Sequence, residues 1–200
     1  MSRQESPCAS GLFDAALAGV GEELRRHTVQ IFDGRRGAGS GVVWRAGWII
    51  TNAHVVRTQE VKIHLDDGRT FEARVVSRDS DLDLAALAAG AANLPAVEIG
   101  ASSALRVGEL VIAAGCPYGL RGAVSAGIVH AIGPIASLGE RNWIQADLEL
   151  APGNSGGPLA DANGRIVGIN TMIAGGLGLA IPSYDVDQFL RRAMMRRRAA

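Results

Sequence analysis

Short apolar and β-branched runs, separated by turn residues, recur along most of this 200-residue chain. Runs of this kind that alternate with Gly, Asp, Asn and Pro are typical of strands joined by tight turns. A first set lies at 29–32, 40–44, 48–51, 61–65, 70–77 and 84–88, and a second set lies at 110–114, 123–132, 143–147, 157–160, 166–172 and 178–181. We therefore expect an all-β protein whose strands span residues 28–182 and divide into two groups near residue 100.

The two ends of the chain follow a helical pattern instead. Leu12, Leu17 and Leu24 recur near helical spacing, which predicts a helix over 11–27 after a polar start. A second helix is predicted over 183–198, with Ser183 as its N-cap and acidic residues in its first turns. The expected organisation is thus an N-terminal unit at 1–27, a strand-built unit at 28–182 and a basic C-terminal helix at 183–200.

The composition narrows the classes of function. The formal net charge is zero, so no global field favours nucleic acid or an anionic membrane. The arginines near the C-terminus have no aromatic residues among them, and we interpret them as a solvated helix end rather than a nucleic-acid site. The histidines lack Cys or carboxylate partners at metal-ligand spacing, so we expect no metal and no cofactor. No stretch is long and apolar enough to span a bilayer.

One short segment carries the chemistry. Residues 152–158 read Pro-Gly-Asn-Ser-Gly-Gly-Pro, which places Ser155 among small residues. A serine hydroxyl becomes a nucleophile only beside a base, and the reaction also needs backbone N–H groups that face the developing oxyanion. Glycines allow the backbone conformations that turn those N–H groups inward. We expect Gly153 and Ser155 to supply the N–H groups of an oxyanion hole, with Asn154 between them.

A histidine and an aspartate precede this serine in a meaningful order. His54 follows an apolar strand at 48–51, and Asp83 lies in an acidic turn that enters the apolar run at 84–88. The order His, Asp, Ser is that of chymotrypsin-like enzymes, in which histidine is the base and aspartate orients it. Asp79 and Asp81 are rivals for the aspartate, and spacing alone does not decide between them. We favour Asp83 because it enters the strand directly.

The chain at this point resembles the HtrA (DegP/Deg) family of serine proteases. Matching segments include Thr-Asn-Ala-His-Val-Val at 51–56 and Asp-Leu-Ala at 83–85. The others lie at 39–43, 105–109, 127–129, 145–147, 152–159, 167–171 and 180–183. The resemblance implies a chymotrypsin-like double β-barrel with His54, Asp83 and Ser155 at the cleft between the barrels. It also implies an endopeptidase that cuts unfolded or misfolded protein.

Further expectations rest on the same resemblance. In the family the N-terminal segment often builds a trimer through aromatic contacts, a part that Phe13 would take here. Many members continue into a PDZ domain where this chain ends, so we expect either a protease-only member or a shortened chain. Many members are periplasmic, but the start of this chain lacks a basic and an apolar signal region. We therefore expect a cytoplasmic location, or an extracytoplasmic one if the chain is processed.

The substrate pocket is expected beside the serine. In chymotrypsin-like enzymes it is lined by the loop before the serine and by a later strand, which here gives Glu149, Leu150, Ile169, Asn170 and Thr171. Glu149 lies six residues before Ser155, where trypsin has an acidic pocket base, but the HtrA-like surroundings favour an apolar pocket with Glu149 turned outward. We predict that Val or Ala is preferred over Arg before the cleaved bond.

Two alternatives complete the expectations. The glycine-rich segment at 34–41 lacks the Gly-Lys-Ser/Thr ending of a phosphate-binding loop and leads into a strand, so we interpret it as a turn. For the whole protein, the alternative to an active endopeptidase is a chaperone-like or protein-binding module on the same fold with weak proteolysis. Cys8 and Cys116 are expected to be free thiols.

Overall fold

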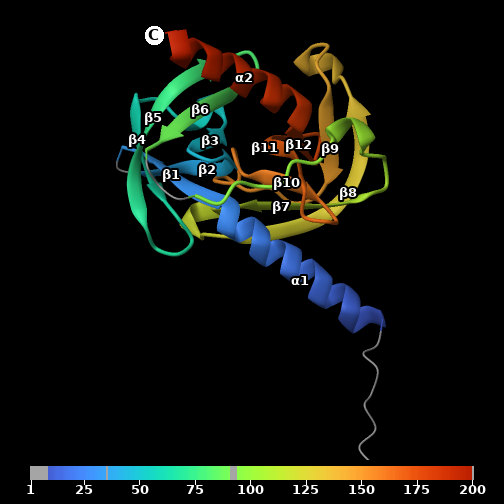
Figure 1. Cartoon of the computed structure of the whole chain (residues 1–200). Helices are drawn as coiled ribbons and strands as arrows, with labels where there is room; N and C mark the ends of the chain where they lie inside the picture. The colour runs from blue at the N-terminus through green and yellow to red at the C-terminus, as the bar shows by residue number, and fades with distance from the viewer. Residues whose placement is uncertain (1–8, 35, 91–93, 200) are drawn as a thin grey trace, which may run out of the picture.

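Two closed antiparallel β-barrels of six strands each form the body of the protein in a computed structural model, which describes residues 9–34, 36–90 and 94–199 (Figure 1). The barrels follow one another in the sequence and are joined by an irregular connection that includes residues 94–109. This architecture confirms the prediction of an all-β, chymotrypsin-like double barrel with a short helix at each end.

The first barrel has the strand order β1-β2-β3-β6-β5-β4. Along β4 the buried Val61 and Ile63 alternate with exposed residues, as expected for a strand with one face inside a barrel. The turn between β4 and β5 contains Gly68 at a φ of +88°, a conformation that favours glycine. The strands are β1 (Thr28–Asp33), β2 (Arg36–Arg45), β3 (Trp48–Thr51), β4 (Glu60–His64), β5 (Thr70–Asp79) and β6 (Leu84–Ala89).

The second barrel has the order β10-β11-β12-β9-β8-β7. Its interior is a separate cluster of aliphatic side chains, among them Val111, Ile144 and Leu159. The strands are β7 (Leu110–Gly115), β8 (Ala123–Gly133), β9 (Trp143–Asp147), β10 (Pro158–Asp161), β11 (Ile166–Ala174) and β12 (Leu177–Pro182). Because each barrel closes on itself, the two barrels share no sheet.

The C-terminal helix α2 (Ser183–Ala199) lies across both barrels (Figure 1). Phe189 and Leu190 are buried in a cluster that also contains Trp44 of the first barrel and Leu179 of the second. Burial of a large apolar side chain stabilises a fold by about 1.5–3 kcal/mol, so this helix contributes substantially to holding the barrels together.

The expected N-cap role of Ser183 is wrong. Its hydroxyl donates to the carbonyl oxygen of Gly100 at 2.8 Å and accepts the N–H of Ser102 at 3.2 Å. Ser183 therefore ties the helix start to the connection between the barrels. The carboxylate of Asp187, in the next turn, accepts the indole N–H of Trp44 at 2.9 Å.

The N-terminal helix α1 (Ala9–His27) confirms the predicted helix, and its first half extends away from the barrels (Figure 1). Leu24 is buried against the barrels, whereas Leu12 and Phe13 are more than half exposed. His27 is buried at the helix end, where its ring nitrogens lie 2.9 Å from Glu23 and 2.9 Å from the carbonyl oxygen of Pro95. Neither helix is long and apolar enough to cross a bilayer within the described residues.

Candidate active site

Three loops from the two barrels carry the candidate catalytic residues. His54 lies on a single 3₁₀ turn (Ala53–Val55) that follows β3, and Asp83 closes the turn that leads into β6. Ser155 lies in the loop before β10, in the second barrel. The histidine and the aspartate are therefore contributed by one barrel and the serine by the other.

His54 and Asp83 are joined directly by hydrogen bonds. The Nδ1 atom of His54 lies 2.9 Å and 3.0 Å from the two carboxylate oxygens of Asp83, and the backbone N–H of His54 donates to Oδ1 at 3.1 Å. A carboxylate only accepts, so Nδ1 carries the proton and Nε2 is left as the basic nitrogen. This is the tautomer that a general base beside a serine requires.

The backbone at Asp83 is unusual. Its φ of 54° places a non-glycine residue in the left-handed region, which carries a cost of about 1 kcal/mol or more. The side-chain amide of Asn52 donates to the Asp83 carbonyl at 2.9 Å and holds that conformation. Burial raises the pKa of the Asp83 carboxyl, but hydrogen bonds from His54 and Thr171 outweigh it and leave the pKa below its usual range.

The two rival aspartates are placed elsewhere. Asp79 accepts the N–H groups of Asp81 and Leu82 and so closes the turn locally. The side chain of Asp81 is exposed. Of these three acidic residues, only Asp83 contacts His54 within the described part of the chain.

Thr171 connects the serine to the aspartate. The Ser155 hydroxyl donates to the backbone carbonyl of Thr171 at 2.8 Å, and the Thr171 hydroxyl donates to Asp83 Oδ2 at 2.7 Å. The register of β11 against β12 shifts between Asn170 and Met172, so Thr171 lies at a bulge that aims both groups at the site. Among the described residues, no hydrogen bond joins Ser155 to His54.

The loop before Ser155 leaves two N–H groups available. Gly153 has a φ of +109°, and a Cβ there would collide with the carbonyl oxygen of Cys116. The N–H of Tyr118 donates to the Pro152 carbonyl at 3.1 Å, which turns the N–H of Gly153 to the opposite side of that peptide. The N–H of Asn154 is bonded to Ala151, whereas those of Gly153 and Ser155 donate to no oxygen atom of the described residues. The sequence-predicted oxyanion hole would therefore use Gly153 and Ser155, with Asn154 as a support.

Ser40 of β2 fastens this loop to the first barrel, a role the sequence did not indicate. Its hydroxyl donates to the Gly153 carbonyl at 2.6 Å and accepts the N–H of Cys116 at 2.8 Å. Its own N–H donates to the Ser155 carbonyl at 2.9 Å. Ser40 is completely buried, so these bonds are shielded from water.

The residues expected to line the substrate pocket divide into two groups. Leu150 is buried beside Gly178 of β12, and Glu149 is exposed as expected. Ile169, in contrast, is fully buried in the core cluster between the barrels, and the Asn170 side chain donates to the Pro158 carbonyl. Leu150 stays a pocket candidate because it lies beside Gly178, and Thr171 because its carbonyl oxygen accepts the Ser155 hydroxyl.

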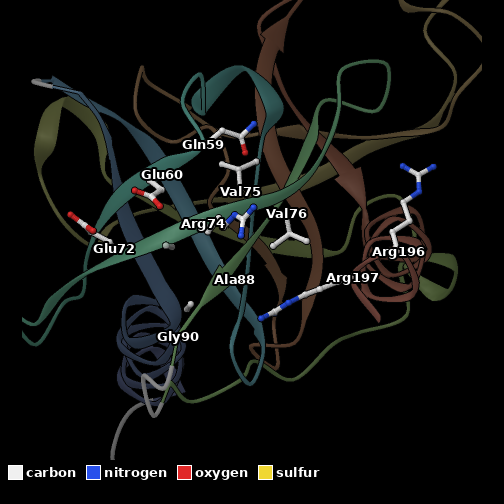
Figure 2. A pocket seen from close by; sticks show the side chains of 12 residues that line it. Gln59, Glu60, Glu72, Arg74, Val75, Val76, Ala88, Gly90, Arg196 and Arg197 are labelled. Carbon is white, nitrogen blue, oxygen red and sulfur yellow. The ribbon is translucent and has the colours of Figure 1, made fainter. Parts of the chain in front are cut away.

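One cavity lies next to the candidate active site and another lies away from it. A cavity of about 500 Å³ adjoins the serine loop and is lined by Phe32, Cys116, Tyr118 and Gly153 among others. A larger cavity, about 670 Å³, lies between β5, β6 and the last turns of α2, where Figure 2 shows Arg197 extending toward the strands. It contains no candidate nucleophile and none of the three candidate catalytic residues.

The cysteine near the site is not positioned as a nucleophile. Cys116 is a buried free thiol, as expected, and burial raises its pKa. A raised pKa keeps a thiol protonated and unreactive at neutral pH. Cys8 lies outside the described residues.

Comparison with known proteins identifies the family of this chain. The family model described as a trypsin-like peptidase domain matches residues 39–169. The mitochondrial serine protease HTRA2 of Drosophila persimilis is 42% identical over 170 residues, which cover 80% of this chain and 40% of that protein. The periplasmic serine endoprotease DegP of Salmonella typhimurium is 43% identical over 160 residues, covering 74% of this chain and 34% of DegP.

A solved structure is also closely similar. The HtrA-type protease AlgW, determined with a decapeptide, superimposes with a TM-score of 0.83 at 30% identity, covering 90% of this chain and 67% of that one. The chain spans less than half the length of the curated relatives named above. The chain belongs to the trypsin-like peptidase family, and within that family its relatives are HtrA-type serine proteases.

Proposed function

We propose that this protein is a serine endopeptidase in which His54, Asp83 and Ser155 form the catalytic triad. The observation that carries the proposal is the pair of short contacts from the Asp83 carboxylate to Nδ1 of His54, with Ser155 held on the same threonine that binds Asp83. A protein that only bound polypeptide would need none of these contacts.

The first half of the reaction forms an acyl-enzyme. Rotation of the Ser155 side chain exchanges its bond to the Thr171 carbonyl for one to Nε2 of His54. The oxygen then attacks the substrate carbonyl carbon while Nε2 takes the hydroxyl proton. The N–H groups of Gly153 and Ser155 stabilise the oxyanion, and Asp83 stabilises the imidazolium. Collapse breaks the C–N bond, and Nε2 gives the proton to the departing amine.

The second half regenerates the serine. Water replaces the departed amine and gives a proton to Nε2 as its oxygen attacks the ester carbon. The same oxyanion hole stabilises the second tetrahedral intermediate. Its collapse releases the carboxylic acid product, and Ser155 recovers its proton from His54.

A fluorophosphonate probe tests this proposal directly. We expect covalent labelling of the parent protein at Ser155, no labelling of Ser155→Ala, and parental labelling of Ser103→Ala, which changes an exposed serine in the connection. Asp83→Asn is expected to lower kcat by about 10⁴-fold, because the amide favours the wrong histidine tautomer. A parent that binds polypeptide but neither labels nor cleaves under any condition contradicts the proposal and favours the chaperone-like alternative.

We further propose that unfolded polypeptides are the substrates and that the residue before the cleaved bond is small and aliphatic. The apolar side chains of Leu148 and Leu150 both lie against Gly178, while the intervening Glu149 is exposed, which favours an apolar pocket beside this strand. A peptide library should therefore rank Val and Ala above Arg at this position, and unfolded casein should be cut faster than a stably folded protein. The opposite ranking in the library refutes the apolar pocket.

We also propose that α1 mediates self-association. Leu12 and Phe13 are 58% and 57% exposed on a helix whose first half leaves the body of the protein. Exposed apolar residues gathered on one projecting element are typical of an interface. Phe13→Glu should lower the molar mass measured by light scattering, whereas Asp14→Glu on the same helix should not. A parent that is monomeric at all concentrations refutes this part.

The working compartment is proposed from the relatives. Their names place one in the periplasm and another in mitochondria, and neither supports the expected cytoplasmic location. We propose that this protein works outside the cytoplasm, and fractionation of cells that express it with its natural flanking sequence tests this.

A further inference from the structure

One arginine of the second barrel reaches the turn that carries Asp83. Arg141 lies at the end of the irregular segment 134–142 between β8 and β9. Its guanidinium carbon lies 3.6 Å from the centroid of the Trp143 ring, and its NH1 group donates to the carbonyl oxygen of Asp81 at 3.1 Å. Asp81 is two residues before Asp83, so the contact joins the second barrel to the catalytic turn.

The indole fixes where the guanidinium points. Trp143 is the first residue of β9 and is 2% exposed, so its ring is held by the core. A guanidinium held over an aromatic face is attracted by the electrons of the ring and loses freedom to move. Trp143, which is fixed in the core, therefore sets the direction in which the Arg141 guanidinium donates to the Asp81 carbonyl.

Arg141 also places a positive charge near several aspartate carboxylates. Burial lowers the pKa of its guanidinium, and the negative charges of Asp83, Asp185 and Asp79 oppose that effect. No ion pair within 4 Å joins Arg141 to any of them in the described part of the chain. Its influence on the turn therefore acts through the Asp81 carbonyl and through the field around the acidic cluster.

The turn needs this support because its conformation is strained. Asp83 has a φ of 54°, and the turn is otherwise held from within the first barrel by Asp79 and by Asn52. From the barrel that carries Ser155, Thr171 holds the Asp83 carboxylate and Arg141 holds the backbone of the turn at the Asp81 carbonyl. A shift of the Asp81 carbonyl would tilt the Asp83 carboxylate away from Nδ1 of His54.

We propose that Arg141 is a positioning residue for the catalytic carboxylate. By holding the Asp81 carbonyl it keeps Asp83 in line with His54 and with the serine of the other barrel. Arg141 makes this contact from its place over the Trp143 ring, so the start of β9 supports the turn through one side chain. The inference rests on the proposed endopeptidase function.

Two substitutions separate packing, charge and hydrogen bonding. Arg141→Met keeps an apolar chain over Trp143 but removes the charge and the donor, and Arg141→Lys keeps the charge without the planar group. Arg106→Met is the matched control, because Arg106 lies in the connection just before β7 and forms an exposed pair with Glu109. Each variant is compared with the parent in kcat, KM, rate of fluorophosphonate labelling and thermal unfolding.

We expect Arg141→Met to lower kcat and the labelling rate by about 10- to 100-fold, the range for a misplaced catalytic group. KM should stay within about twofold, because the contact does not bind substrate. Millimolar guanidinium ion should restore part of the lost rate in Arg141→Met and none in Ser155→Ala. Arg141→Lys should lie between the parent and Arg141→Met, and Arg106→Met should match the parent.

Three results overturn the inference. The first is a folded Arg141→Met with parental kcat, and the second is an equal loss of kcat in Arg106→Met. The third is a loss of kcat that is explained by partial unfolding and is not restored by added guanidinium ion. If Arg141→Met does not fold, Arg141→Lys decides, and a parental kcat in that variant overturns the inference. A parent that neither labels nor cleaves would refute the proposed function itself, which is a distinguishable outcome.

Discussion

Removal of the Ser40 hydroxyl should weaken both the fold and the catalytic loop. In Ser40→Ala the N–H of Cys116 loses its acceptor at a buried position, and the Gly153 carbonyl loses its donor at a partly buried one. An unpaired buried backbone group costs about 1–3 kcal/mol, and loss of an ordinary hydrogen bond costs about 0.5–1.5 kcal/mol. We expect a total loss of about 2–4 kcal/mol in the free energy of unfolding.

The expected loss is small enough for the variant to fold and large enough to measure. Domains are typically stable by about 5–15 kcal/mol, so Ser40→Ala should remain folded at room temperature. For a chain of this length about 2–4 °C of Tm is lost per kcal/mol, which gives a decrease of roughly 4–16 °C. Urea unfolding followed by circular dichroism gives the free energy directly. Ser103→Ala, at an exposed serine, is the control.

The same substitution should also slow acylation. The Ser40 hydroxyl fixes the peptide between Gly153 and Asn154, and the N–H groups on either side of it form the proposed oxyanion hole. Loss of one oxyanion donor costs about 10²–10³-fold in kcat, so a loosened hole should cost about 10- to 100-fold. Neutral surface substitutions change the free energy of unfolding by less than about 0.5 kcal/mol. If Ser40→Ala falls within that range and is labelled at the parental rate, the role of Ser40 in holding this loop is refuted.

Two further substitutions probe the same loop and the bulge beside it. Gly153→Ala should lower the rate of fluorophosphonate labelling by at least about 100-fold. A Cβ at this position would collide with the carbonyl oxygen of Cys116 and displace the N–H of the oxyanion hole. Burial raises the pKa of the Asp83 carboxyl, but hydrogen bonds from His54 and Thr171 leave this pKa below its usual range. The ionised carboxylate therefore stabilises the fold above about pH 4. This stabilisation is lost as the pH falls through the lowered pKa. Thr171→Val should reduce this dependence, and urea unfolding from neutral to acidic pH should show a shallower loss of stability than in the parent; an unchanged pH profile contradicts the role of the Thr171 hydroxyl.

The barrels were predictable because their signals are local. Alternation in β4 and the glycine turn that follows it depend on neighbouring residues, and both are visible without the structure. The His54, Asp83 and Ser155 candidates were likewise visible, because each is embedded in a short segment with its own composition. The structure places His54 against Asp83 and leaves Ser155 on Thr171.

The supports of the site were not predictable, because their partners are distant in sequence. Ser40 and Gly153 are 113 residues apart, and no local pattern marks a serine in β2 as a fastener of a loop in the other barrel. The wrong N-cap role of Ser183 has the same cause, since its actual partners are Gly100 and Ser102 in the connection. Ile169 was assigned to the pocket by analogy with the strand that follows the serine in chymotrypsin-like enzymes, but its side chain is fully buried in the core cluster between the barrels.

The bulge at Thr171 links the two halves of the proposed triad through one residue. Its carbonyl holds the Ser155 hydroxyl and its side chain holds Asp83, so a displacement of β11 at this point moves the nucleophile and the orienting carboxylate together. Attack on a substrate requires Ser155 to leave the Thr171 carbonyl, whereas the bond from Thr171 to Asp83 can persist. Arg141 and Thr171 therefore have complementary effects: both come from the second barrel, and they hold the Asp83 turn from the Asp81 carbonyl and from the carboxylate itself. Alignment of the triad across the two barrels thus depends on contacts made by the barrel that does not carry Asp83.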